Sequence, residues 1–429
     1  MDKMLMLGSC KAGNELLYEA KKRGIHTILA DRYTQDQVKF NVEADEFWHI
    51  DTSDIDELEK RCRAEEVTAV INGISTFNTA STMELCRRLG LPCCCSPDAW
   101  SYTINKEKFK NLCEKNGVPV AKAYHISNQP TREELERIEY PVVVKAIDQS
   151  ANRGMSYCFS ADEIVPAMEY ARSLSGNETV IIEKMLSGTE YGAWYAMADG
   201  EARLFGFVSM LHQPEEPNNC YSVTTTVADH LDLYLKEIDP YFCQALKEGN
   251  MNEGIAWIEL ILDQDGHFYV LEMGYRLAGD MMAGPLKEIT HFDSYSWLID
   301  IAAGFRHKPQ DLPKKQTQMY DRAGCSYILW SKDMAGSVSK IYGVEEICSK
   351  YEVKVTYDIK EGQEFRAHQY LLTFTFVEES TEEMCDIIAN INKCVRVMDD
   401  KGENIVIYFN DYKTIYQMQD NNAKKIGRN

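Results

Sequence analysis

The sequence predicts a protein of mixed α/β and α+β class, with a Rossmann-like first domain, a larger central domain and a small α+β domain at the end. A chain of 429 residues is too long for one core, because single cores stop growing near ~250–300 residues. Strands and helices alternate in the first part, and the pattern changes to α+β further on. The stretch KPQDLPKKQTQ near residue 310 indicates a boundary. We therefore expect domains at 1–100, 101–310 and 311–429.

The first domain is predicted from short apolar runs that alternate with amphipathic helices. The strands are MLMLG (4–8), HTILAD (26–31) and TAVING (68–73), and the helices are NELLYEAKKRG (14–24), DIDELEKRCRAEE (54–66) and 78–89. This alternation is typical of parallel βαβ units. NAD binding is the alternative, because Gly8 and Gly13 follow the first strand and Asp31 ends the second. The middle glycine of G-x-G-x-x-G is missing, so we favour a simple βα turn.

Composition and charge are those of an ordinary globular protein. Apolar residues make up 45% of the chain and charged residues 26%, as in soluble domains. The formal net charge of −21 argues against nucleic acid as a partner, because phosphate backbones require basic patches. There is no long apolar run and no signal-peptide pattern, so we expect no membrane span and a cytoplasmic location. The 14 cysteines lack zinc-site spacing, and we expect them to be reduced and mostly buried.

The central and last domains are predicted from apolar strands and one capped helix. The central strands are VVVKA (142–146) and TVIIEKML (179–186), and the later ones are CSYILWS, YLLTFTFVE and NIVIYF. Ser160 and Glu163 have the spacing of a capping box, which predicts a helix near 160–175.

The segment GIAWIELILDQDGHFYVLEMGYR (254–276) is the most informative in the chain. Asp265-Gly266 between two apolar runs predicts a two-residue hairpin turn, which places Glu259 opposite Glu272. Two facing carboxylates repel each other, and a divalent cation between them removes the penalty. Mg²⁺, or Mn²⁺ in its place, suits such oxygen ligands together with substrate phosphates. The alternative is a longer loop, a register slipped by one residue and one exposed glutamate.

Two lysines and a polar loop are candidates for a phosphate site. Lys145 ends an apolar strand, an unusual place for a charge unless it points into a site. The loop after it carries Ser150, Arg153 and Gly154, which offer phosphates a hydroxyl, a guanidinium and loose backbone. Lys106 begins a helix, where the free N–H groups favour anions. Each lysine alone is more often a solvated surface residue, and their order and spacing favour the site.

Taken in order, these residues resemble the ATP-grasp superfamily, which includes L-amino acid ligases, D-alanine–D-alanine ligase, biotin carboxylase and carbamoyl phosphate synthase. The resemblance covers roughly residues 1–310 and implies a two-lobed domain that binds ATP and Mg²⁺. The segment VIIEKMLSGTEYGAW (180–194) is similar to the family's adenine-binding hinge. The implied nucleotide-binding residues are Lys106, Lys145, Ser150, Arg153, Gly154, Glu183, Lys184, Met185, Leu186 and Glu190. Glu259 and Glu272 are the implied metal ligands, and Arg276 and Lys145 the implied catalytic residues.

The sequence departs from the family pattern at two positions. The family usually has Glu-x-Asn-x-Arg, with the Asn as a further metal ligand, and Gly274 stands at that position. Water could fill the place, a single Mg²⁺ could be held, or Asp280 could move in. Asn105 stands where an aspartate is usual before the lysine.

The resemblance implies an ATP-dependent ligase that activates a carboxylate as an acyl phosphate and joins it to an amine. Its partners are then small molecules, and a homodimer is one possible assembly. His212 and Tyr275 are candidate substrate contacts, although a surface histidine and a packed tyrosine explain them as well. The alternatives are a bicarbonate-activating enzyme, similar to carbamoyl phosphate synthase or a carboxylase, and an ATP-binding module with little or no ligase activity.

Overall fold

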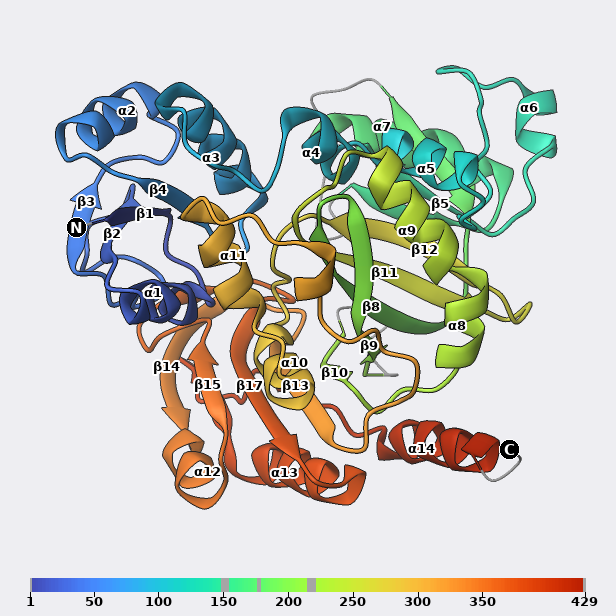
Figure 1. The fold of residues 1–429 in the computed structure, drawn as a ribbon. Coiled ribbons are helices and arrows are strands. Elements are labelled where there is room, and N and C mark those ends of the chain that lie inside the picture. Colours follow the sequence, from blue (N-terminus) through green and yellow to red (C-terminus); the bar gives the residue numbers. More distant parts are fainter. Residues whose placement is uncertain (1, 148–153, 176–178, 214–220, 427–429) are drawn as a thin grey trace.

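The protein folds as a mixed α/β molecule in which three segments of the chain surround a central sheet (Figure 1). The computed structural model describes residues 2–147, 154–175, 179–213 and 221–426. Ser150 and Arg153 lie outside these residues. The predicted mixed α/β and α+β class is confirmed.

The N-terminal layer is a parallel sheet in the strand order β3-β2-β1-β4. Its elements are β1 (Lys3–Leu7), α1 (Gly13–Lys22), β2 (His26–Asp31), β3 (Glu46–His49), α2 (Ile55–Ala64), β4 (Ala69–Asn72) and α3 (Thr76–Leu89). The predicted βαβ pattern is therefore correct, whereas β3 was not predicted. The carboxylate of Asp31 accepts the backbone N–H groups of Ser9, at 2.9 Å, and of Tyr33, at 3.1 Å. These hydrogen bonds explain why an aspartate stands at the end of β2.

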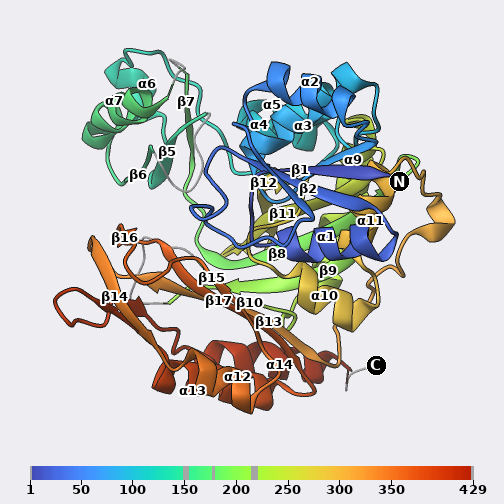
Figure 2. The same ribbon diagram turned by 90° about the vertical axis from the view of Figure 1, so that its left-hand side faces the viewer.

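The first lobe of the central region is a small antiparallel sheet in the order β6-β5-β7. The elements up to its last strand are α4 (Pro97–Ile104), α5 (Lys106–Lys115), α6 (Arg132–Glu136), β5 (Val142–Ala146), β6 (Met155–Cys158), η1 (Ala161–Glu163), α7 (Ile164–Leu174) and β7 (Val180–Lys184). In Figure 2 this sheet, with α6 and α7, stands apart from the rest of the molecule.

The capping box predicted for this lobe is wrong. Ser160 makes no side-chain capping bond, and a short 3₁₀ turn precedes α7. The Glu163 carboxylate accepts the Phe159 N–H at 2.7 Å instead. Pro166 lies in the first turn of α7, where its missing N–H costs nothing, so the α-helix proper starts only at Ile164.

The second lobe and the C-terminal third share one large sheet. Its order is β12-β11-β8-β9-β10-β13-β17-β15, and β19 also pairs with β13. The elements up to residue 311 are β8 (Gly188–Ala198), β9 (Glu201–Leu211), β10 (Val223–Thr225), α8 (Leu231–Glu237), α9 (Asp239–Glu248), β11 (Gly254–Asp263), β12 (Phe268–Gly274), α10 (Ala283–Thr290), α11 (Ser294–Ala302) and η2 (Pro309–Asp311). The remaining elements are β13 (Ala323–Ser331), β14 (Gly336–Tyr342), α12 (Val344–Lys350), β15 (Lys354–Tyr357), β16 (Glu364–Phe365), β17 (Tyr370–Glu378), α13 (Thr381–Cys394), β18 (Arg396–Asp399), β19 (Val406–Ile407) and α14 (Tyr412–Ile426).

Because β10 hydrogen-bonds to β13, the sheet continues past residue 310. The three domain ranges stay a prediction, and the last two of them share this sheet.

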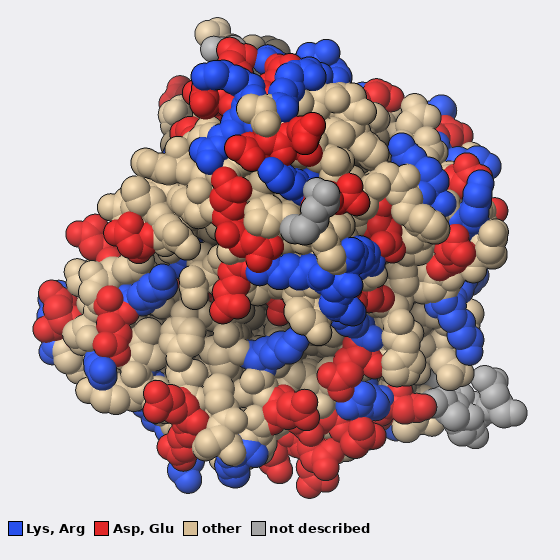
Figure 3. Space-filling model, turned by 60° about the vertical axis from the view of Figure 1, so that its left-hand side comes forward, with Lys and Arg blue, Asp and Glu red and all other residues tan. Residues whose placement is uncertain are grey.

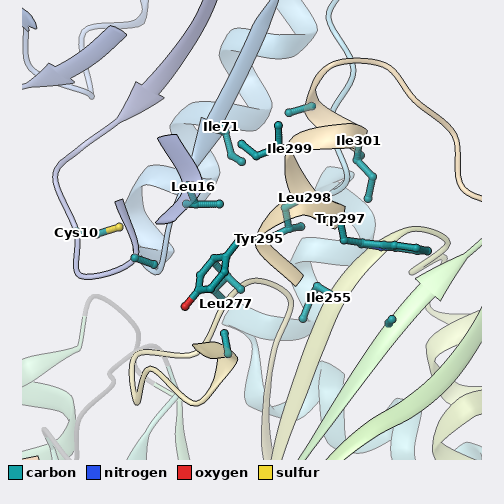
Figure 4. Close-up of a cluster of buried hydrophobic side chains, with 14 of the residues drawn as sticks. Cys10, Leu16, Ile71, Ile255, Leu277, Tyr295, Trp297, Leu298, Ile299 and Ile301 are labelled. Carbon is teal, nitrogen blue, oxygen red and sulfur yellow. The ribbon is translucent and has the colours of Figure 1, made fainter. Parts of the chain in front are cut away.

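A buried apolar cluster joins the N-terminal layer to the large sheet (Figure 4). Leu298 and Ile301 of α11 lie with Ile71 of β4, Ile255 of β11 and Leu277 in this cluster. Ile255 lies in β11, and Leu277 follows β12 by a few residues. The cluster therefore holds the β11–β12 hairpin against the N-terminal layer. Burial of this kind is the main stabilising contribution in a fold of this size.

The surface carries both signs of charge. On the face drawn in Figure 3, acidic side chains are widespread, and a group of Lys and Arg side chains lies among them near the middle. Within the described residues, no helix has the length and apolar character needed to cross a membrane. The described cysteines are free thiols and mostly buried.

Candidate functional site

The hairpin of β11 and β12 brings two glutamates face to face, as the sequence predicts. Glu259 pairs directly with Glu272. The predicted two-residue turn is nevertheless wrong: Asp263 N–H donates to the His267 carbonyl at 3.0 Å, so the loop is Gln264–Gly266. Gly266 takes a positive φ of 82° there, which glycine tolerates without strain.

A β-bulge restores the predicted pairing. Near the loop, Leu260 pairs with Val270, whereas a two-residue turn would pair it with Leu271. The register then shifts by one residue between Glu259 and Leu260. Leu271 is therefore the extra residue, and after it Glu272 again faces Glu259. Bulges of this kind commonly redirect side chains beside active sites.

The carboxylate pair lies in an acidic environment. Burial and the nearby carboxylate of Glu272 are the main causes that raise the pKa of Glu259 well above its ordinary value, and Glu190 and Asp280 add to them. Arg276 opposes this shift only in part. A divalent cation would relieve the repulsion, so these two side chains fit a metal ion that takes oxygen ligands.

Arg276 lies beside the pair and is held in place. Its Nη1 donates to the Leu277 carbonyl at 2.7 Å, and its Nη2 donates to Thr76 Oγ1 at 3.3 Å. Its guanidinium carbon is 5.3 Å from the centroid of the Trp257 ring. Burial lowers the pKa of Arg276, and the Glu272 carboxylate is the first of the groups that oppose the shift. The guanidinium is therefore positioned close to the acidic pair.

Lys145 belongs to a buried cluster with two other charged residues. Its Nζ lies 2.8 Å from Oε2 of Glu183, which also pairs with Lys110 of α5. Burial would raise the pKa of Glu183, but the positive charges of Lys145 and Lys110 lower it overall. Burial and the charge of Lys145 lower the pKa of Lys110 to about 8. Lys110 was not predicted as a site residue from the sequence, although it lies one helical turn after Lys106.

The other described nucleotide candidates lie at the start of α5, just before β6, at the end of β7, between β7 and β8, or in β8. Lys106 is the first residue of α5, where the Asn105 side chain caps the helix through Lys108 N–H. The backbone N–H groups of Lys184 and Met185 donate to the carbonyls of Lys122 and Pro141. Leu186 follows Met185 in the sequence, so its backbone N–H is the next hydrogen-bond donor along this segment. Gly154 has a positive φ of 71°.

Glu190 of β8 lies on the same face as the carboxylate pair. It is one of the groups that raise the pKa of Glu259, and its Oε2 is 3.0 Å from Nε2 of His212. Tyr275 is buried and donates its hydroxyl to the Cys94 carbonyl at 2.8 Å. Its hydroxyl is therefore used within the fold, as expected for a packed tyrosine.

Residues from distant parts of the chain also approach this face, and they were not predicted from the sequence. Tyr221 lies near Glu259 and bonds to Tyr370 of β17. The Tyr370 ring lies 4.1 Å below Nζ of Lys11, which follows β1. Burial raises the pKa of Asp280 to about 6, and the charge of Lys11 opposes the shift. No local motif marks these residues, since they are joined only by the tertiary fold.

Comparisons with known proteins find similar sequences and similar structures. Residues 105–308 match the family model described as the carbamoyl-phosphate synthase L chain, ATP binding domain. A formate-dependent phosphoribosylglycinamide formyltransferase of Methanocaldococcus jannaschii is 31% identical over 186 residues, covering 42% of this chain and 47% of that protein. The chain thus spans about half the length of the curated relatives it matches.

Two solved structures share the fold over most of the chain. An L-amino acid ligase from Bacillus licheniformis has a TM-score of 0.74 at 18% identity, covering 93% of this chain and 99% of that one. The biotin carboxylase domain of the Hydrogenobacter thermophilus 2-oxoglutarate carboxylase, solved with MgADP and bicarbonate, has a TM-score of 0.73 at 17% identity, covering 93% and 91%. At these identities the likeness concerns the fold alone.

Proposed function

We propose, from the premise that residues 105–308 belong to the ATP-grasp superfamily, that the protein is an ATP-dependent carboxylate–amine ligase. The observation that carries this proposal is the facing pair Glu259 and Glu272 with the guanidinium of Arg276 beside it. A concentrated negative charge next to a fixed cation suits a site that holds a metal ion and transferring phosphate together.

The nucleotide is proposed to bind between the two lobes. Adenine lies along Glu183–Leu186 and takes the Leu186 N–H, and Glu190 binds the ribose hydroxyls. Lys106, Lys145 and Gly154 contact the phosphates, and Ser150 and Arg153 are proposed as further phosphate-binding residues. Two features support this placement: Lys145 reaches β7 through its ion pair with Glu183, and Glu190 shares the face of the carboxylate pair.

The reaction we propose needs no side-chain nucleophile. A carboxylate oxygen of the first substrate attacks the terminal phosphorus of ATP, and ADP leaves with the electrons of the broken P–O bond. The amine nitrogen of the second substrate attacks the resulting acyl phosphate at carbon, phosphate leaves, and the amine loses a proton. Arg276 and Lys145 orient and neutralise the phosphoryl oxygens. When bound by Glu259 and Glu272, Mg²⁺ or Mn²⁺ supplies further positive charge for those oxygens.

ADP release over a matrix of amino acids and small carboxylic acids tests the proposal. We expect ADP and phosphate only when both a carboxylate and an amine are present. Glu272→Gln should lower turnover roughly 100-fold or more, because it removes one carboxylate from the cation site. The matched control is Glu201→Gln, at a 58% exposed side chain at the start of β9, which should keep wild-type turnover. Undiminished ADP release by Glu272→Gln would refute the assignment.

A bicarbonate-activating enzyme is the second candidate, because the biotin carboxylase domain with bicarbonate shares this fold. Bicarbonate-dependent ADP release without any amino acid would favour it. ATP binding by calorimetry without ADP release across the whole matrix would favour a binding module instead. A cytoplasmic location and a homodimer also remain proposals, and light scattering of the purified protein tests the second.

A further inference from the structure

Gly274 and Trp257 fit together in a way that excludes any side chain at position 274. The two residues are directly opposite each other in the β11–β12 pair. A Cβ atom placed on Gly274 would lie 2.2 Å from Cε2 and 2.6 Å from Nε1 of the Trp257 indole. Such contacts are far inside van der Waals distance, and the indole edge would have to move. The ring therefore occupies the space that a side chain of residue 274 would need.

The indole lies on the same face of the hairpin as the carboxylate pair. Side chains two residues apart on a strand share a face, so Trp257 lies beside Glu259, and Gly274 lies beside Glu272. Arg276 also contacts this ring, because its guanidinium carbon is 5.3 Å from the ring centroid. The ring thus lies beside both the carboxylates and the arginine, at the position where the related pattern has a metal-binding asparagine.

Among the residues that the structure describes, the indole nitrogen has no hydrogen-bond partner. Trp257 is 8% exposed, and its Nε1 is a buried polar atom without an acceptor from these residues. An indole N–H can donate a hydrogen bond but cannot bind a cation. A buried donor without an acceptor is costly, so native proteins usually pair it. This nitrogen lies beside the backbone of Gly274, near the place proposed for the transferring phosphate. An oxygen atom of a bound ligand would therefore be a suitable acceptor.

Among the described residues, no further acidic or histidine cluster stands at the missing ligand position. Within the described part of the chain, no group of three or more His, Cys, Asp or Glu side chains could hold a metal ion. Asp280 Oδ1 accepts the Met282 N–H at 3.0 Å, which ties this carboxylate to its own loop.

We propose that Trp257 replaces a metal ligand with a hydrogen-bond donor. The site then holds one divalent cation through Glu259 and Glu272, and the Trp257 N–H donates to an oxygen of the terminal phosphate of the bound nucleotide. This inference rests on the proposed ATP-dependent function and adds to it a one-cation site. Gly274 is required in this arrangement because only glycine leaves room for the indole.

Counting bound Mn²⁺ by electron paramagnetic resonance, with a non-hydrolysable ATP analogue, tests the number of cations. The wild-type protein should bind one Mn²⁺ per nucleotide. The double variant Trp257→Ala/Gly274→Asn, which restores the asparagine and clears its space, should bind two. Two equally tight Mn²⁺ ions in the wild type would overturn the inference and leave the ligase proposal standing. Absence of any nucleotide binding would overturn both.

Thermal melting without ligand tests the steric part separately. Gly274→Asn alone should lower the melting temperature clearly, because the amide collides with the indole, and Trp257→Ala in the same chain should recover part of the loss. Equal losses with and without Trp257 would show that the two positions are not coupled and would refute the fit. This result does not depend on nucleotide binding.

The variant Trp257→Phe tests the donor, because it keeps an aromatic ring and removes the N–H. Affinity for the ATP analogue should fall roughly tenfold, whereas affinity for ADP, which lacks the terminal phosphate, should stay unchanged. Equal affinities for the analogue in the wild type and Trp257→Phe would refute the hydrogen bond.

Discussion

At the scale of single residues, Asp280 makes stability depend on pH. Burial raises its pKa from 3.8 to about 6, so between these values the folded state keeps a proton that the unfolded state has released. The stability from the neutral carboxyl is fully present below the lower pKa and is lost as the pH rises through the higher one. We expect Asp280→Asn, which is neutral at every pH, to be more stable than the wild type at pH 8, by up to about 3 kcal/mol.

Urea unfolding at several pH values between 4.5 and 8, with a chelator to remove divalent cations, measures this effect. The advantage of Asp280→Asn should be constant well above the folded pKa of about 6 and should shrink as the pH falls through and below that value. The control is Asp321→Asn, at an exposed side chain, which should leave the free energy of unfolding close to that of the wild type. A constant difference across the pH range would contradict the assigned burial effect.

The sequence identified the residue types of the candidate site better than their surroundings. The pair Glu259 and Glu272 was predicted from the hairpin register, the role of Arg276 was predicted from the resemblance, and the structure brings the three together. Lys110 and Trp257 were not found, because a lysine in a helix and a tryptophan in a strand are ordinary choices. Only the tertiary fold shows that the first pairs with a buried glutamate and that the second fills the space over Gly274.

At the scale of elements, the hairpin shows how a correct pairing followed from a partly wrong local prediction. Asp265-Gly266 indicated a two-residue turn, whereas the loop has one residue more, and the bulge at Leu271 compensates. The presence of a strand can be predicted from an apolar run, which is visible directly in the sequence. Loop length and bulges depend on packing against neighbouring strands, so a single sequence predicts them less well.

The docking of α5 on the small sheet depends on Glu183, and its removal should destabilise the protein. Glu183→Gln leaves Lys110 and Lys145 without their shared carboxylate, and breaking a buried pair in this way costs about 3–5 kcal/mol. Lys110→Met should cost less, because Glu183 keeps Lys145 at 2.8 Å. Urea unfolding of both variants and of the double variant gives the coupling energy. A loss below about 0.5 kcal/mol for Glu183→Gln would show that the cluster does not hold α5.

At the scale of the whole molecule, the large sheet links the second lobe to the C-terminal third, and a buried ion pair links that third to the N-terminal layer. The strand β10 joins β9 to β13, so the two predicted domains share backbone hydrogen bonds. Composition suggested a boundary near residue 310 because Pro and Lys gather there, but a sheet can continue through strands far apart in sequence. The predicted order of domains gave no indication that Lys11 would reach β17.

We expect the Lys11 ion pair to hold the C-terminal third against the first layer. Nζ of Lys11 lies 2.9 Å from Asp358 Oδ1 and 3.0 Å from Thr373 Oγ1, and the two charged side chains are 3% and 0% exposed. Lys11→Met leaves Asp358 buried without its cation, which should cost about 3–5 kcal/mol, and Asp358→Asn in the same chain should recover much of it.

Lys354→Met is the control, because its pair with Glu15 spans the same two regions. That pair is 4.0 Å long, and its lysine is 78% exposed. Surface pairs contribute at most about 1 kcal/mol. Urea unfolding measures the losses, and limited proteolysis should cut Lys11→Met first within 311–429. Equal stability of Lys11→Met and Lys354→Met would show that the buried pair does not hold these regions together.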